Sequence, residues 1–136
     1  MNLSNKTVCV IGASGLLGSN VLKEALARGY KVNGTLRDVN APGKATFLNA
    51  LPNAEANLRL FEAEMADKAS FDDAFSNVDC VFIACLIPVY KGPTGKPARE
   101  MDDEQGYAEI IMPTVNGCLN IMNAAAKQKV KNVVIC

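Results

Sequence analysis

Three glycines at regular spacing are the residues of this chain whose type and position could do chemistry. Gly12, Gly15 and Gly18 form the pattern G-x-x-G-x-x-G. They follow an apolar run at residues 6–11 that predicts a buried strand, and they open an apolar periodicity at residues 16–28 that predicts an amphipathic helix. Glycine permits the sharp turn between such elements, and the first amides of a helix can donate to an anion. This context predicts a loop that holds the pyrophosphate of a dinucleotide, with a merely tight turn as the alternative.

The end of the second predicted strand, residues 31–36, bears on which dinucleotide is held. NAD sites place an acid there for the ribose 2′-hydroxyl, whereas NADP sites place a cation for the 2′-phosphate. Asp38 has the spacing of the NAD acid, but it comes after Arg37 and outside the strand, where we expect the loop to turn it away. Arg37 offers a planar fork suited to phosphate, and Lys44 could add a further charge. The two cations therefore favour NADP over NAD, with solvated loop charges as the alternative.

Strand-like and helix-like segments alternate along the rest of the chain. Further strands are predicted at residues 58–63, 79–85 and 132–135, and further helices at 45–51, from a capping box at Ser70, and at 104–127 with a break near Pro113. Residues 88–101, rich in Gly and Pro, predict a surface loop. The alternation predicts an α/β fold with a doubly wound parallel sheet, the Rossmann fold, as one dinucleotide-binding domain over residues 1–136. We expect this fold to be truncated after about its fifth strand, and the domain to be incomplete at its C-terminus.

Composition limits the classes of partner. The 136 residues are 49% hydrophobic, which suits one globular domain, and the 14 basic and 14 acidic residues form no charged block. This balance argues against nucleic acid or anionic lipid as a partner and leaves small molecules or proteins. No apolar run reaches the roughly 18 residues of a membrane span and no leader is evident, so we expect a soluble, cytoplasmic protein. Without histidine, the five cysteines predict no metal site, and Cys9 and Cys80 are expected to be buried thiols.

Five short segments share a pattern with one family. They read VIGASGLLGS from Val10, GYKV from Gly29, TLRD from Thr35, SFDDA from Ser70 and PTVNG from Pro113. Together they resemble the extended short-chain dehydrogenase/reductase superfamily, particularly its dihydroflavonol reductase and cinnamoyl-CoA reductase branch. The resemblance implies the NADP-binding part of an oxidoreductase that reduces a small-molecule carbonyl, in a ketone, aldehyde or activated thioester, by hydride transfer. The oligomeric state is left open.

The resemblance also extends the candidate site. It implies that the two cations grip the 2′-phosphate and that Glu64 and Met65 lie beside the adenine, where the family usually has Asp-Leu. It implies that Ala84, Cys85 and Leu86 lie on the nicotinamide side, where apolar groups here replace the family's polar His-x-Ala-Ser/Thr-Pro pattern. The predicted cofactor-binding residues are Gly12, Ser14, Gly15, Leu16, Leu17, Gly18, Arg37, Lys44, Glu64, Met65, Ala84, Cys85 and Leu86.

No catalytic residue is predicted in this chain. The family uses a serine and a Tyr-x-x-x-Lys pair, in which the tyrosine protonates the carbonyl oxygen. Tyr30, Tyr90 and Tyr107 all lack a lysine four residues later, so the chain alone is expected to be inactive. Two alternatives stay open: a non-catalytic dinucleotide-binding sensor or interaction module, and a relative of NAD-dependent nucleotide-sugar epimerases or dehydratases. Arg37 counts against the second.

Overall fold

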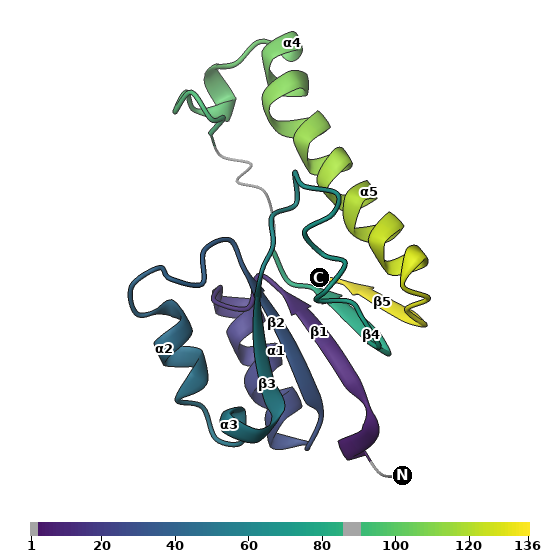
Figure 1. The fold of residues 1–136 in the computed structure, drawn as a ribbon. Helices are drawn as coiled ribbons and strands as arrows, with labels where there is room; N and C mark the ends of the chain where they lie inside the picture. The colour runs from purple at the N-terminus through teal and green to yellow at the C-terminus, as the bar shows by residue number, and fades with distance from the viewer. Residues whose placement is uncertain (1–2, 86–90) are drawn as a thin grey trace.

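The chain forms one parallel five-stranded sheet in the order β3-β2-β1-β4-β5 (Figure 1). The computed structural model describes residues 3–85 and 91–136. The strands are β1 Thr7–Ile11, β2 Lys31–Leu36, β3 Leu58–Glu62, β4 Cys80–Ile83 and β5 Asn132–Ile135. The order reverses beside β1, as in a doubly wound sheet, where ligands bind beyond the carboxyl ends of the strands. The predicted fold class is confirmed.

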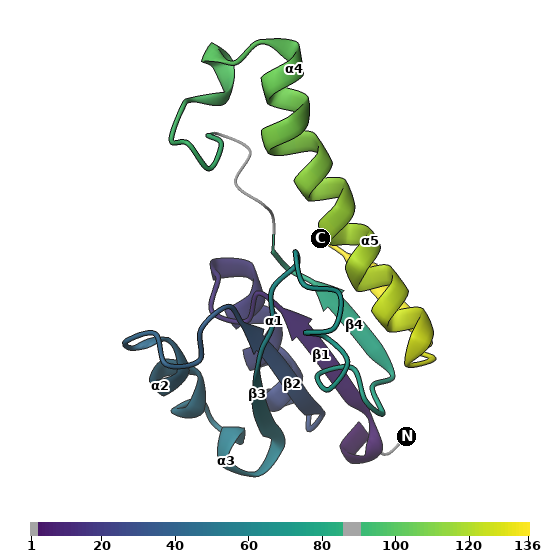
Figure 2. The ribbon, with the colours of Figure 1, turned by 45° about the horizontal axis from the view of Figure 1, so that its top comes forward.

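Alternate side chains of β1 enter two hydrophobic cores on opposite faces of the sheet. Val8 and Val10 pack with α1 (Leu16–Ala27), α2 (Lys44–Asn49) and α3 (Ala54–Asn57). On the other face, Cys9 and Ile11 pack with residues of the 66–78 segment and with α5 (Met112–Lys127). Figures 1 and 2 show α1 to α3 on one side of the sheet and α5 on the other. Because strand side chains alternate between faces, an almost uninterrupted apolar strand requires helices or loops over both faces.

The segment that follows β3 differs from its prediction. The capping-box spacing at Ser70 predicts a short helix, but residues 68–77 form a series of turns. The Ser70 hydroxyl is directed back along the chain: its Oγ donates to Glu64 O at 3.0 Å and accepts from Glu64 N at 3.0 Å. A hydroxyl engaged in this way is not available to cap a helix that begins at the next residue. The predicted helix is therefore wrong, and Ser70 closes the loop after β3 instead.

Two further differences concern helices. The short helix α3 is missing from the prediction, and it begins after Asn53, whose φ of 67° is left-handed. The long helical segment begins at Asp103 as α4 (Asp103–Gly106), passes through a π-helical turn (Tyr107–Ile111) and continues as α5. The wider turn ends at Ile111, two residues before Pro113, which has no N–H to donate to the preceding turn; the predicted break lies here. Before α4, the loop contains an isolated bridge between Lys91 and Pro97 and a 3-10 turn at Ala98–Glu100.

Asn33 is a buried polar residue within β2. Its side chain is 7% exposed, and its Nδ2 donates to Ala74 O at 2.8 Å, which ties the 66–78 segment to the sheet. We expect Asn33→Ala to lower the free energy of unfolding by about 1–3 kcal/mol, because Ala74 O loses its buried donor. Urea denaturation measures the change. The exposed Asn49, replaced by alanine, is the control and should leave stability nearly unaltered; equal stabilities of the two variants would contradict this role of Asn33.

Asp79 joins the beginnings of three strands. Its carboxylate accepts from Thr7 N at 3.1 Å and pairs with Lys6 at 3.3 Å and Lys131 at 3.9 Å. The backbone hydrogen bond from Thr7, followed by the charges of the two lysines, lowers the pKa of Asp79 below its ordinary value of 3.8, against an opposing effect of burial. A pKa that is lower in the folded state stabilises the fold above pH 4 or so, and this contribution is lost as the pH falls through the folded-state pKa.

Asp79→Asn therefore should lower stability at neutral pH and make the loss of stability below pH 4 less steep. Chemical denaturation at a series of pH values measures both effects. Asp73→Asn removes the same charge from an exposed side chain and serves as the control. If the stability of Asp79→Asn falls as steeply below pH 4 as that of the unmodified chain, the stabilising role of the Asp79 carboxylate is contradicted.

None of the helices in residues 3–85 and 91–136 has the length and apolar character needed to cross a membrane.

Candidate functional site: the loop between β1 and α1

The loop between β1 and α1 leaves space only for glycine at two positions. Gly12 has a φ of 76°, which side-chain-bearing residues rarely adopt, and its carbonyl oxygen accepts from Gly15 N at 3.0 Å. A Cβ atom on Gly18 would overlap the Gly12 carbonyl oxygen and lie 2.8 Å from the Gly12 carbonyl carbon. The first turn of α1 is therefore in direct contact with the end of β1. Bare backbone faces the space beyond the strand ends here.

The N-terminus of α1 is open to an anion. Its N-cap residue is Gly15, which has no side chain to accept from the first turn. The next two side chains are apolar and face solvent, with Leu16 87% and Leu17 48% exposed. The first N–H groups of a helix have no acceptor within the helix, and its dipole adds a partial positive charge. In a helix of 12 residues this arrangement suits a phosphate group.

The end of β4 lies against the glycine loop. Ala84 N donates to Ile11 O at 3.1 Å, continuing the parallel pairing of β1 with β4. A Cβ atom on Gly12 would lie 2.6 Å from Cys85 Cβ and 3.3 Å from Ala84 O. Two segments that the sequence separates by 70 positions thus meet at one edge of the sheet. Leu86, the third residue predicted there, lies outside the described residues.

The segment after β3 reaches the same edge. Ala63 N donates to Leu36 O at 2.9 Å, and Met65 Sδ lies 3.6 Å from Cys85 Sγ. Glu64 is exposed. The structure therefore brings the predicted Glu64–Met65 segment beside the predicted Ala84–Cys85 segment and, through Cys85, beside the glycine loop.

The Cys85 thiol is partly buried and neutral. Burial raises the pKa of Cys85 above its ordinary value of 9.0, and Cys118 acts in the same direction, whereas the positive charge of Arg37 partly offsets them. Arg37 therefore acts on this edge of the sheet from its position directly after β2. At neutral pH the Cys85 side chain adds no charge to the site.

The residues after β2 occupy the positions that the choice between NAD and NADP depends on. Arg37 is exposed, and its guanidinium group makes no hydrogen bond or ion pair with another described residue. The Asp38 carboxylate accepts from Asn40 N at 2.8 Å and is thus engaged within its own loop. Lys44 is the first residue of α2, which begins one residue earlier than predicted, and its side chain is exposed. Of Arg37 and Asp38, which follow β2, Arg37 is thus the one whose charged group has no partner among the described residues.

Sequence reasoning missed two residues that hold the Glu64–Met65 segment. Ser70 bonds both the N–H and the carbonyl of Glu64, and Asn120 Nδ2 donates to Met65 O at 2.8 Å. The signal for Asn120 was present: it falls on the buried face of α5 with Gly117, Ile121, Ala124 and Ala125. A polar side chain on an otherwise apolar face indicates a specific buried partner.

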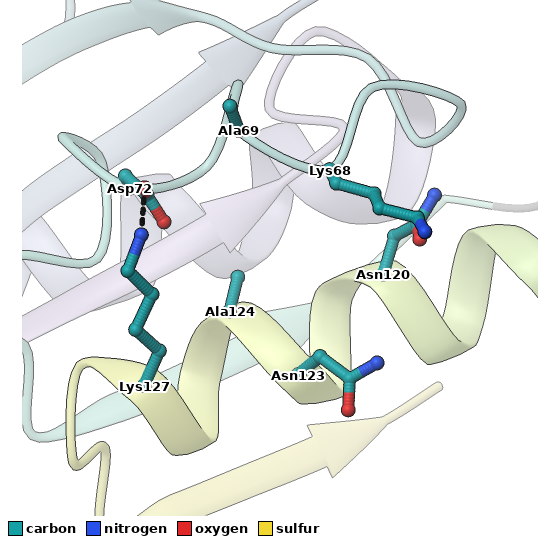
Figure 3. Close-up of a pocket in the computed structure, with 7 residues that line it drawn as sticks. All are labelled: Lys68, Ala69, Asp72, Asn120, Asn123, Ala124 and Lys127. Carbon is teal, nitrogen blue, oxygen red and sulfur yellow. Dashed lines mark hydrogen bonds and ion pairs between the residues drawn. The ribbon is translucent and has the colours of Figure 1, made fainter.

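A separate cavity lies between α5 and the loop after β3 (Figure 3). Its volume is about 260 Å³, and an ion pair between Lys127 and Asp72 spans one side of it. It is lined by Lys68, Ala69, Asp72, Asn120, Asn123, Ala124 and Lys127. None of the residues predicted to bind the cofactor lines this cavity. The candidate cofactor site is therefore the glycine loop and not this cavity.

The five cysteines are free thiols. Cys9 is fully buried, as predicted, and burial raises the pKa of its thiol. Cys80 is only half-buried, so the prediction of a buried thiol is wrong for it. It is the first residue of β4, where it pairs with Val8 and with Asn132 of the exposed edge strand. No group of three or more His, Cys, Asp or Glu residues in the described part of the chain is placed to hold a metal ion.

Comparisons with known proteins place the chain in a family. The model of the NmrA-like family matches residues 4–134. A dihydroflavonol 4-reductase of Arabidopsis thaliana is 40% identical over 124 residues, which are 91% of this chain and 30% of the relative. A cinnamoyl-CoA reductase of Medicago truncatula is 37% identical over 135 residues, 98% of this chain and 38% of the relative. The chain thus spans about a third of the length of these relatives.

A solved structure has the same fold. Gre2 of Candida albicans, in complex with NADPH, is 26% identical with a TM-score of 0.69, over 96% of this chain and 36% of that one. Together with the two reductases, it confirms the resemblance that the motifs indicated, to extended short-chain reductases of the dihydroflavonol and cinnamoyl-CoA reductase branch. The match of the family model over nearly the whole chain shows that the chain belongs to the NmrA-like family.

Proposed function

We propose that this chain is the NADP-binding part of a short-chain-type oxidoreductase that reduces a small-molecule carbonyl. The observation that carries the proposal is the contact between Gly12 and Gly18, which leaves bare backbone beside the open N-terminus of α1. A side chain at Gly18 would push α1 away from β1, and one at Gly12 would overlap Cys85. The glycines thus let the first amides of α1 lie close to the end of β1, where a pyrophosphate could accept from them. The named relatives are reductases, and the Gre2 structure holds NADPH, which supports the choice of ligand.

The residues present fit this cofactor along its length. The first amides of α1 would bind the pyrophosphate, and the exposed Arg37 guanidinium would bind the 2′-phosphate, with Lys44 as a second cation. Glu64 and Met65 would border the adenine, and Ala84 and Cys85 would border the nicotinamide. Ser14 lies in the glycine loop and Leu16 and Leu17 begin α1, so all three would lie beside the same cofactor. Each of these roles is part of the proposal.

The chain contributes binding and orientation. When bound, NADPH supplies a hydride to the carbonyl carbon, and an acid must supply a proton to the carbonyl oxygen. No tyrosine of this chain has a lysine four residues later, so we assign the proton donor to a residue outside it. Ala84 and Cys85 bring no charge to this edge of the sheet at neutral pH and pack against the cores on its opposite faces, so the nicotinamide would have an uncharged border here. The substrate class is a ketone, an aldehyde or an activated thioester.

A turnover assay combined with the mass of the native protein tests the proposal. Purified chain with NADPH and a panel of ketones, aldehydes and CoA thioesters should bind the cofactor without oxidising it. The native protein, isolated from its source, should have a mass well above the 14.5 kDa of this chain and should oxidise NADPH with at least one carbonyl. A native mass equal to that of this chain, or a larger protein inactive toward every carbonyl, would contradict the proposal.

A non-catalytic dinucleotide-binding module is the second candidate. It is favoured by one observation: the chain carries the complete glycine loop but no tyrosine with a lysine at the catalytic spacing. A native protein of this mass that binds NADPH tightly and turns over no substrate would establish the module.

A further inference from the structure

Asn120 is a buried polar side chain that the proposed site leaves without a role. We infer that Asn120 is a positioning residue: by holding the Met65 carbonyl, it fixes the Glu64–Met65 segment beside the dinucleotide. The inference rests on the proposed function for the identity of the ligand. It assigns Asn120 no contact with the cofactor itself.

The hydrogen bond of Asn120 links α5 to the turn after β3, in addition to the apolar packing and the Lys127–Asp72 ion pair between α5 and the 66–78 segment. Its side chain is 8% exposed, in the middle of α5, and its Nδ2 donates to Met65 O at 2.8 Å across 55 sequence positions. Met65 lies in a turn outside the sheet, where no strand pairing orders its backbone. A partly buried carbonyl that loses its donor costs free energy, so this bond favours one conformation of the turn.

Contacts lead from Asn120 to the glycine loop. The backbone that Asn120 holds belongs to Met65, whose Sδ lies 3.6 Å from Cys85 Sγ. Cys85 Cβ in turn lies 2.6 Å from the position that a Cβ atom on Gly12 would take. A displacement of Met65 would therefore open the side of the site that Cys85 closes. Ser70 holds the neighbouring Glu64 and is a second, independent restraint on the same turn.

Asn123 provides a matched control on the same helix. Both asparagines line the cavity between α5 and the loop after β3. Figure 3 shows the Asn120 side chain directed from α5 toward the loop residue Lys68. Asn123 is exposed and makes no hydrogen bond with a residue in the described part of the chain. The two positions thus share helix, residue type and cavity, and differ in the bond to Met65.

The test uses Asn120→Asp, which keeps the size of the side chain and replaces the donor by a charged acceptor that repels Met65 O. We expect two changes. Cys85 should react roughly tenfold faster with iodoacetamide, followed by peptide mass mapping because the chain has five cysteines. The Kd for NADPH should rise by a similar factor. Asn123→Asp should leave both at the values of the unmodified chain. Ser70→Ala, which does not alter α5, should raise both by releasing Glu64. Asn120→Ala, which also removes the donor, covers the case in which Asn120→Asp does not fold.

The outcomes separate this inference from the proposed function. The alkylation rate is measured without cofactor, so it reports the position of Met65 even if no dinucleotide binds. An unmodified chain that does not bind NADPH would end the proposed function, and a faster Cys85 reaction in Asn120→Asp would still support the restraint on Met65. If the unmodified chain binds NADPH and a folded Asn120→Asp variant matches it in Kd or in Cys85 reactivity, the inference is overturned. If Asn120→Asp does not fold, the same result with Asn120→Ala overturns the inference.

Discussion

Replacing Arg37 with alanine is expected to weaken NADPH binding by about 10- to 100-fold and to leave NADH binding nearly unchanged. The guanidinium group comes directly after β2, faces solvent and makes no hydrogen bond or ion pair with a described residue, so it is free for a ligand. Hydrogen bonds to a charged group contribute about 1.5–3 kcal/mol, and every 1.4 kcal/mol changes affinity about tenfold. NADH lacks the 2′-phosphate and therefore cannot lose this contribution.

Two control variants show whether the effect is specific. Arg28→Ala removes another exposed arginine, which pairs with Glu24 at the opposite end of α1, and should leave both affinities unchanged. Lys44→Ala should have a smaller effect than Arg37→Ala, because a single ammonium group lacks the paired donors of a guanidinium. Fluorescence titration of the bound nicotinamide measures the affinities. Equal losses of NADPH and NADH in Arg37→Ala would refute the assignment of the 2′-phosphate site.

Gly18→Ala is expected to reduce the affinity for either dinucleotide by at least about 100-fold and to lower the free energy of unfolding by about 1–3 kcal/mol. The added methyl group would overlap the Gly12 carbonyl oxygen and lie 2.8 Å from its carbon. Both atoms belong to the backbone, so α1 must move away from β1 to make space. Alanine is the better helix former, so helix propensity alone predicts the opposite change in stability.

Gly106→Ala is the control for this substitution. Gly106 is also helical and has a φ of −61°, and apart from its own helix backbone no atom of residues 3–85 and 91–136 lies within 4 Å of its Cβ position. We expect this variant to bind the dinucleotide normally and to be slightly more stable, by about 0.5–1 kcal/mol. Calorimetric titration and thermal denaturation measure the two properties. A Gly18→Ala variant that behaves like Gly106→Ala would contradict the close contact at the glycine loop.

The strands could be predicted because their signals are local. Residues 31–36 and 132–135 were predicted with the boundaries observed, since each is a short extended run bounded by turn-forming or charged residues. The helix at Ser70 was wrong because the same residue pattern serves a backward hydrogen bond to Glu64. Which partner a serine takes depends on where the preceding strand ends in space, and spacing in the sequence does not contain that information.

Some residues of the site could likewise be predicted from local signals, and others could not. The glycine spacing and the position of Arg37 after β2 are local features, and both lie at the predicted end of the sheet. Asn120 was not predicted because its partner lies 55 positions away in a turn. The contact of Met65 with Cys85 could not be predicted, because these residues follow β3 and β4, which β2 and β1 separate in the sheet. The resemblance to a family indicated both segments, whereas the contact between them came from the structure.

Calorimetric titration of the unmodified chain with NADPH and NADH, side by side in the same buffer, tests the central claim most directly. The glycine loop predicts binding of one dinucleotide per chain, and Arg37 predicts a Kd for NADPH that is at least about tenfold lower than that for NADH. Absence of heat with either compound would contradict the dinucleotide site. Tighter binding of NADH would contradict the assignment of NADP.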